Sequence, residues 1–87
     1  MPDGNPYSKR CWFTFPSPEQ VERPILWQMS RKFPDVIFDV RQASVQNNIG
    51  IMAVELRGER DQVQSAIEFC QSLGVQVDPI EKSVIEG

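Results

Sequence analysis

Few residues in this chain have side chains that could do chemistry, and they are spread along the sequence. There is no histidine, which removes the commonest general base and the commonest metal ligand at once. Cys11 and Cys70 are far apart and belong to no CxxC motif, so two such thiols cannot build a structural zinc site or an iron–sulfur cluster within one chain. No nucleophile motif and no group of carboxylates on one loop is present. The sequence therefore predicts no catalytic residue, no metal ligand and no cofactor, and a protein that is not an enzyme.

A run of aromatic residues, 10–16, is the better candidate for a binding function. Side chains alternate across a strand, so Cys11, Phe13 and Phe15 share one face while Trp12 lies on the other. The first face can join a core, and the second then carries a large indole ring. This pattern favours a binding or dimerisation surface over a reaction centre.

Composition narrows the class of protein further. The 87 residues are enough for one small domain, with a formal charge of −3 and nine basic residues that are scattered rather than clustered. A chain that binds phosphate backbones normally has a basic stripe, so we expect no nucleic-acid partner. The N-terminus is not a signal peptide, and no apolar run approaches the ~20 residues that span a bilayer. We expect a cytoplasmic protein with no direct membrane insertion, in which both cysteines are reduced core residues.

Hydrophobic periodicity and turn residues predict the order strand, helix, strand, strand, helix, strand. Ser17 and Gln20 have the spacing of a capping box, but Pro24 lies too far in to continue a helix that begins there. Ser17–Arg23 is therefore expected to be a turn or short helical lead. The predicted strands are 9–15, 36–46, 49–57 and 75–78, and the predicted helices are 24–33 and 61–73.

This order indicates an α+β, ferredoxin-like βαββαβ fold, a four-stranded antiparallel sheet with two helices on one face. Both crossovers are expected to be right-handed, and the first and third strands should lie in the middle of the sheet. We expect a flexible segment at 1–8, the folded domain at 9–80 and a tail at 81–87.

The pattern also predicts which side chains face away from the helices. In the second strand, Val36, Phe38 and Val40 should face the core. Their neighbours Ile37, Asp39, Arg41 and Ala43 should share the other face, and Asn47-Asn48 should form the tight turn before the third strand. Polar residues on the uncovered face fit a solvated surface, on which Arg41 and Glu55 can pair across strands. The aliphatic residues around Trp12 fit that interpretation less well, and they favour an interface or pocket. The residues predicted on this face are Arg10, Trp12, Thr14, Ile37, Asp39, Arg41, Ile51, Ala53, Glu55, Gln76 and Asp78.

Several of these segments together resemble the NIL domain family. They are Phe13-Thr14-Phe15-Pro16, the stretch Ile25–Phe33 with Met29 inside it, Ile49–Gly58, Ala66-Ile67 and Leu73-Gly74-Val75. NIL domains are similar in fold to ACT regulatory domains and form the C-terminal substrate-sensing module of methionine-importer ATPase subunits. The resemblance implies a homodimer that binds L-methionine or a related amino acid near the dimer junction.

The family often has an asparagine where this chain has Asp39, a carboxylate that would attract an ammonium group and repel a carboxylate. Arg41 could pair with a ligand carboxylate, and Ile49 and Ile51 could contact an apolar side chain. Gly50 has two explanations, a close approach by a ligand or chain and a simple hairpin end. The candidate ligand-binding residues are Trp12, Ile37, Asp39, Arg41, Asn48, Ile49, Gly50 and Ile51.

A protein-interaction module with no small-molecule ligand is the alternative function, with Trp12 and Trp27 as anchors. Trp27 lies nearly opposite the apolar side of its predicted helix, beside Arg31, and it could instead pack against the preceding loop. The sequence contains no ATPase domain and no Walker motif, so we expect the module to act through a partner protein or through its ligand-bound state.

Overall fold

Four strands and three helical segments make up the part of the chain that the structure, a computed structural model, describes, which is residues 7–80. Along the chain they are β1 (Tyr7–Phe15), α1 (Pro18–Glu22), α2 (Ile25–Lys32), β2 (Ile37–Gln46), β3 (Ile49–Gly58), α3 (Arg60–Ser72) and β4 (Gln76–Pro79).

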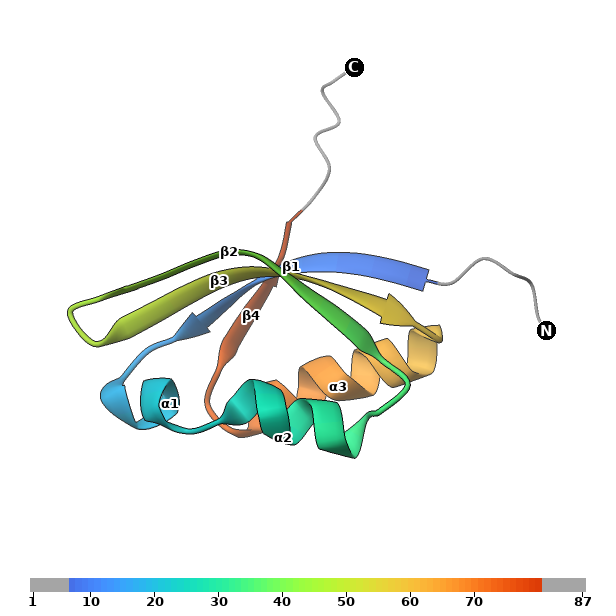
Figure 1. The fold of residues 1–87 in the computed structure, drawn as a ribbon, viewed down its shortest axis with the longest axis horizontal. Coiled ribbons are helices and arrows are strands. Elements are labelled where there is room, and N and C mark those ends of the chain that lie inside the picture. The colour runs from blue at the N-terminus through green and yellow to red at the C-terminus, as the bar shows by residue number, and fades with distance from the viewer. Residues whose placement is uncertain (1–6, 81–87) are drawn as a thin grey trace, which may run out of the picture.

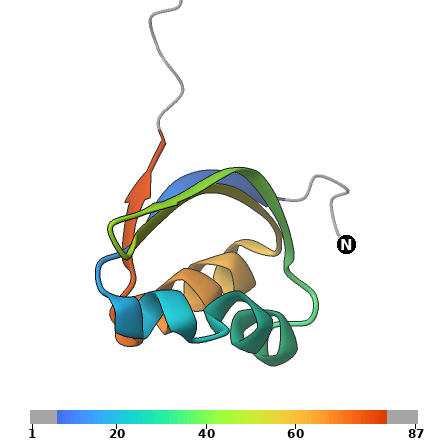
Figure 2. The same ribbon diagram turned by 60° about the vertical axis from the view of Figure 1, so that its left-hand side comes forward.

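The strands form one antiparallel sheet in the order β2-β3-β1-β4, so β3 and β1 lie in the middle (Figure 1). All three helices of the described residues lie on one face of the sheet, which arches over them (Figure 2). The predicted ferredoxin-like fold is therefore confirmed. The other face of the sheet is covered by no element of residues 7–80 and is called the open face below.

The chain after β1 forms two helices because Pro24 separates them. Pro24 is the residue before α2, a position at which no helical hydrogen bond needs a backbone N–H. Its carbonyl accepts a hydrogen bond from the Gln28 N–H at 3.0 Å. The predicted helical lead is thus α1, but the capping box is not formed. The Ser17 hydroxyl donates to Gln20 Oε1, and Gln20 Nε2 donates to the Leu73 carbonyl at 3.5 Å, at the end of α3. Gln20 therefore links α1 to α3 instead of capping its own helix.

The hairpin between β2 and β3 turns at Asn47-Asn48, as predicted. Both residues have positive φ angles, 53° and 64°, which match the twist that two-residue hairpins prefer. The register of β2 on β3 shifts between Val40 and Gln42, so Arg41 is an extra residue on β2. One prediction is wrong for this reason. Ala43 does not share the face of Asp39 and Arg41, because the extra residue turns it to the helix side, where it lies opposite Met52.

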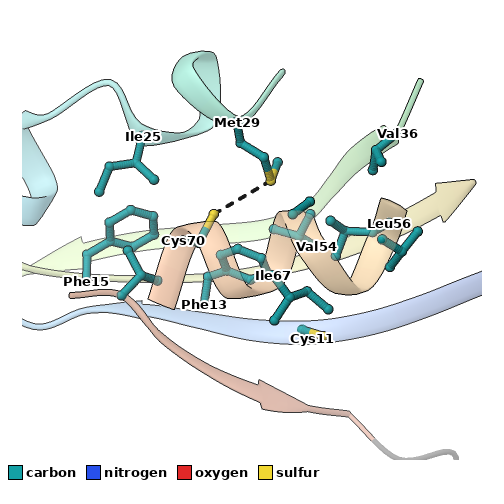
Figure 3. Close-up of a cluster of buried hydrophobic side chains, with 13 residues drawn as sticks. Cys11, Phe13, Phe15, Ile25, Met29, Val36, Val54, Leu56, Ile67 and Cys70 are labelled. Atoms are coloured by element: carbon teal, nitrogen blue, oxygen red, sulfur yellow. Dashed lines mark hydrogen bonds between the residues drawn. The ribbon is translucent and has the colours of Figure 1, made fainter. Parts of the chain in front are cut away.

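The core lies between the sheet and the helices, where Phe13, Val54 and Leu56 are fully buried at the centre of the sheet (Figure 3). From the helix side, Met29 of α2 and Cys70 of α3 meet, and the Cys70 thiol donates a hydrogen bond to Met29 Sδ at 3.6 Å. Both cysteines are buried and unpaired, as predicted. The alternation of β1 and the apolar stripe of α3 are confirmed by the buried positions Cys11, Phe13, Phe15, Val63, Ala66, Ile67 and Cys70.

The ends of the domain differ slightly from the predicted bounds. β1 begins at Tyr7, two residues early, and the guanidinium of Arg60 lies 4.3 Å from the centre of the Tyr7 ring. At the end of α3, Gly74 has a φ of +95° and continues the chain in the left-handed conformation that glycine adopts without strain. The predictions for residues 1–6 and 81–87 lie outside the described residues.

Candidate functional site

The open face has an aromatic centre at Trp12 on β1. Trp12 lies opposite Ala53 of β3 in the register, and its side chain is 38% exposed. Ile51, two residues before Ala53 on β3, is 42% exposed and faces the same way, opposite Thr14. Ala53 itself is buried. The middle strands therefore present a patch in which the indole and an isoleucine flank a small alanine.

An ion-pair cluster adjoins this patch and is centred on Glu55, which is only 9% exposed. Arg41 Nη2 donates to Glu55 Oε1 at 2.7 Å, and the Ser8 hydroxyl donates to Oε2 at 2.8 Å. Arg10 Nε lies 3.5 Å from Oε1, and Arg57 Nη1 lies 3.9 Å from Oε2. Three guanidinium groups thus share one carboxylate, and each contacts it through a single nitrogen. Because a guanidinium carries five N–H donors, donors remain for another acceptor.

The contacts within this cluster shift the pKa values of Glu55 and Arg41 so that both charged forms are favoured. The hydrogen bonds from Arg41 and Ser8 lower the pKa of Glu55 from 4.5 to about 2, although burial acts in the opposite direction. The hydrogen bond to Glu55 raises the pKa of Arg41, and nearby Asp39 adds to that rise. Asp39 Oδ2 lies 3.8 Å from Arg41 Nη2. Three arginines and two carboxylates leave one positive charge in excess, which favours an anionic group nearby.

Replacing Glu55 with glutamine should lower the free energy of unfolding at neutral pH, because the three arginines lose their shared counter-charge. Since the folded-state pKa is depressed, the stabilisation is complete above about pH 4.5 and is lost as the pH falls toward 2. Urea unfolding of both proteins from pH 7 to pH 2 at constant ionic strength measures this, with exposed Glu68→Gln as the control. A difference between wild type and Glu55→Gln that stays constant over this range would contradict the expectation.

Two hollows flank Arg10 on the open face. The smaller has a volume of about 190 Å³ and lies between the indole and the ion-pair cluster; it is lined by Arg10, Trp12, Arg41, Gln42, Ala53, Val54 and Ile80. The larger, about 450 Å³, is more polar and is lined by Ser8, Lys9, Arg10, Glu55, Pro79 and Ile80. The smaller hollow joins an aromatic wall to guanidinium donors, a combination suited to a small molecule with an apolar part and a charged part.

A third hollow lies on the helix side of the sheet, and the sequence did not predict it. It has a volume of about 270 Å³ and is almost entirely apolar, between the α1–α2 break and the β2–β3 hairpin. Trp27 of α2 lies at its rim, is 58% exposed and carries the guanidinium of Arg31 5.2 Å from its ring centre. It is lined by Phe15, Val21, Arg23, Pro24, Ile25, Leu26, Trp27, Ala43, Ser44, Val45, Gly50 and Met52.

The sequence of this domain matches a known protein family. The NIL domain family matches residues 11–79, which is most of the described domain. The chain belongs to the NIL domain family. The comparison with curated proteins gives no match. Among solved structures, the C-terminal domain of an ABC transporter ATP-binding protein from Enterococcus faecalis is similar, with a TM-score of 0.69, 20% identity and 86% of each chain covered. At that identity the structural likeness shows the fold alone.

All eight candidate ligand-binding residues lie inside the segment that matches the NIL domain, but they do not form one cluster. Trp12 and Arg41 line the smaller open-face hollow, and Asp39 lies 3.8 Å from Arg41 within the ion-pair cluster. Ile51 extends the same face toward the hairpin, where Ile49 lies opposite Gln46 and Asn48 forms the turn. Ile37 lies near the other end of β2, opposite Arg57.

Gly50 of this NIL domain lies on the opposite side of the sheet from Ile49 and Ile51. A Cβ atom built on Gly50 would lie 3.5 Å from Phe15 Cβ and 3.6 Å from Val21 Cγ2, both on the helix side. Gly50 therefore lines the apolar hollow beneath the hairpin and not the open face. Side-chain alternation alone separates it from its neighbours, a signal that the sequence already contained.

The described part of this NIL domain was also searched for metal sites and for membrane-spanning helices. Across residues 7–80, no three His, Cys, Asp or Glu side chains gather in a way that could hold a metal ion. Within the same range, the longest helix is too short and too polar to cross a bilayer.

Proposed function

We propose that this NIL domain is a non-enzymatic regulatory domain of the cytoplasm that binds a free amino acid, with L-methionine as the first candidate. The observation that carries the proposal is the smaller open-face hollow, which Trp12 lines together with Arg10 and Arg41. Membership of the NIL family supports a regulatory role. The shared fold with the C-terminal domain of a transporter ATP-binding protein is consistent with that role.

Each part of an amino acid has a partner of matching chemistry at this hollow. The side chains of Arg10 and Arg41 are 58% and 48% exposed, and each has N–H groups beyond the one that contacts Glu55, so they can bind a carboxylate. Asp39 lies beside the hollow, 3.8 Å from Arg41, and its half-exposed carboxylate can accept from the ammonium group. The methionine thioether would lie against the indole face of Trp12, a favourable sulfur–aromatic contact. A ligand with both charges and an apolar side chain therefore fits better than an anion or an alkane.

A second copy of the chain would complete this site. Trp12, Ile49 and Ile51 are exposed apolar residues along the open face, and burying them against a partner would remove that surface from water. The guanidinium groups of Arg10 and Arg41 in each copy would then lie in a less hydrated environment, where their contacts with a ligand carboxylate strengthen. We propose a homodimer formed through this face, with the amino acid at its edge. Light scattering at rising protein concentration should show a dimer for the wild type and a monomer for Trp12→Asp.

Calorimetric titration with L-methionine and a panel of other amino acids tests the ligand. The wild type should bind methionine, while methionine methyl ester and N-acetylmethionine, which each lack one charge, should bind at least about tenfold more weakly. Trp12→Ala should weaken methionine binding to a similar extent. Trp27→Ala is the matched control, because Trp27 lies on the other side of the sheet and its loss should leave the affinity unchanged. The absence of heat with every amino acid, or equal binding by Trp12→Ala, would reject the proposal.

A further inference from the structure

The larger of the two hollows beside Arg10 lies where β4 stops short of β1. Strand β3 pairs with β1 over residues 7–15, whereas β4 pairs with it only over residues 11–14. One further main-chain hydrogen bond follows that ladder, from the Ile80 N–H to the Arg10 carbonyl at 2.9 Å. The hollow of about 450 Å³ therefore borders the first half of β1. We call it the β1 edge hollow.

The first half of β1 presents main-chain groups at this hollow. In an antiparallel pair, alternate residues direct their N–H and C=O groups toward the same neighbouring strand. The Arg10 carbonyl accepts from Ile80, so Ser8, two residues earlier, directs its N–H and C=O toward the same edge. No strand of residues 7–80 pairs with Ser8 on that side. A molecule in the hollow would therefore meet one main-chain donor and one main-chain acceptor.

The hollow carries more positive than negative charge. Lys9 and Arg10 line it, and Lys9 forms no ion pair with any residue from 7 to 80. Among the described residues, Glu55 is the one acidic side chain that lines it. Three guanidinium groups already contact the two oxygens of that carboxylate. An anionic group beside Lys9 and Arg10 is therefore attracted more than it is repelled.

The hollow is larger than a simple anion requires. A water molecule takes a share of about 30 Å³ in the liquid, so an inorganic phosphate ion would fill only a part of about 450 Å³. Small-molecule sites usually span about 300–1,000 Å³. The wall at Pro79 and Ile80 is apolar and suits the carbon skeleton of a ligand better than a second charge. The anion is therefore expected to be one end of a larger polar molecule.

We propose that the β1 edge hollow binds a phosphate monoester of a small hydroxylated molecule. The phosphate lies beside Lys9 and Arg10, whose two positive charges match the charge of about −1.5 to −2 that a phosphate monoester carries at neutral pH. A hydroxyl group both donates and accepts, so it can satisfy the C=O and the N–H of Ser8 together. This site goes beyond the proposed amino-acid site, which uses Arg10 but neither Ser8 nor Lys9.

Calorimetric titration of the full chain in a phosphate-free buffer tests this assignment. The probes are glycerol phosphate and ribose phosphate, and the matched controls are glycerol, ribose and inorganic phosphate. The two esters should bind at least about tenfold more tightly than inorganic phosphate, and the neutral parents should give no heat. Amide signals in NMR spectra should move at Ser8 and Lys9, and not at Gln42, which lines only the smaller hollow.

Variants separate recognition by charge from recognition by the main chain. Lys9→Gln is a surface change that removes one cation, and it should weaken ester binding at least about tenfold. Ser8→Pro removes the main-chain N–H and should also weaken ester binding, whereas Ser8→Ala, its matched control, keeps that N–H and should bind the esters as the wild type does. Proline is tolerated where a strand N–H faces no partner, and circular dichroism checks that each variant is folded.

Titration of the same variants with methionine distinguishes the two sites. Lys9→Gln should leave methionine binding unchanged, because Lys9 lines only the β1 edge hollow. Trp12→Ala should weaken methionine binding and leave ester binding unchanged, because Trp12 lines only the smaller hollow. The failure of one proposal is therefore distinguishable from the failure of the other.

Three results would overturn the proposal. One is that neither ester binds below about 1 mM. Another is that inorganic phosphate binds as tightly as the esters, which would mean an adventitious ion only. The third is that Lys9→Gln binds the esters as tightly as the wild type does.

Discussion

Replacing Phe13 with alanine is expected to remove about 3–5 kcal/mol from the free energy of unfolding. Phe13 lies on a central strand, is fully buried and packs against Met52 and Val77 across both neighbouring strands. A domain of 87 residues has only about 4–13 kcal/mol in total. We therefore expect the variant to be close to unfolded at physiological temperature, with a urea midpoint far below that of the wild type.

Trp12→Ala is the matched control because Trp12 is the next residue of the same strand and points to the open face. Its side chain is partly exposed already, so the change should cost less than half as much stability as Phe13→Ala. The same urea titration measures both variants. If the two changes destabilised the monomer equally, the assignment of these residues to a core face and an open face would be wrong.

The two thiols of the folded protein are expected to react with a disulfide reagent at least about a hundredfold more slowly than the thiols of the protein unfolded in urea. Burial raises the pKa of the Cys70 thiol from 9.0 to about 11, and burial likewise raises the pKa of Cys11. Two units of pKa lower the thiolate fraction about a hundredfold at neutral pH, and exclusion of the reagent slows the reaction further. Absorbance of the released thiol measures the rate.

The pH dependence of that reaction provides an independent check. In urea the labelling rate should stop rising with pH at about one pH unit above the ordinary thiol pKa. In the native protein the labelling rate should still rise with pH at about pH 10. Cys70→Ser and Cys11→Ser identify the contribution of each thiol. Fast native-state labelling of either one would contradict a buried, reduced role for that cysteine.

Local patterns in the sequence predicted most of the fold correctly. The alternation of Cys11, Phe13 and Phe15 indicated the buried face of β1, and Asn47-Asn48 indicated the hairpin turn. These signals are reliable because each depends on residues that are neighbours in the chain. Pro24 similarly predicted where the first helical region would be interrupted.

The errors have a common cause, which is that partners distant in sequence changed a local preference. The bulge at Arg41 reversed the face of Ala43, and nothing in the local alternation marks an extra residue. Gln20 has the spacing of a capping residue, but the carbonyl of Leu73 lies within its reach and takes its side-chain amide. A competing long-range partner of this kind is visible only once the helices are packed.

The candidate sites were predictable in part. Trp12, Asp39 and Arg41 could be placed on one face from alternation, and the pairing of Arg41 with Glu55 was anticipated. The convergence of Arg10 and Arg57 on the same carboxylate was not, because it depends on the exact register of β1 and β3. The apolar hollow on the helix side of the sheet was missed because its walls come from strands and helices that only the folded chain brings together.

The sequence by itself determined the elements, their order, the buried faces of β1 and β3 and the absence of histidine, because these depend on residue type and on short-range periodicity. The tertiary structure decided which charged side chains pair with one another and which residues line the hollows. Glu55 became the centre of three arginines and Gly50 became part of the apolar hollow through contacts between residues far apart in the chain. Such contacts are set by strand register and helix packing, which a single residue pattern does not encode.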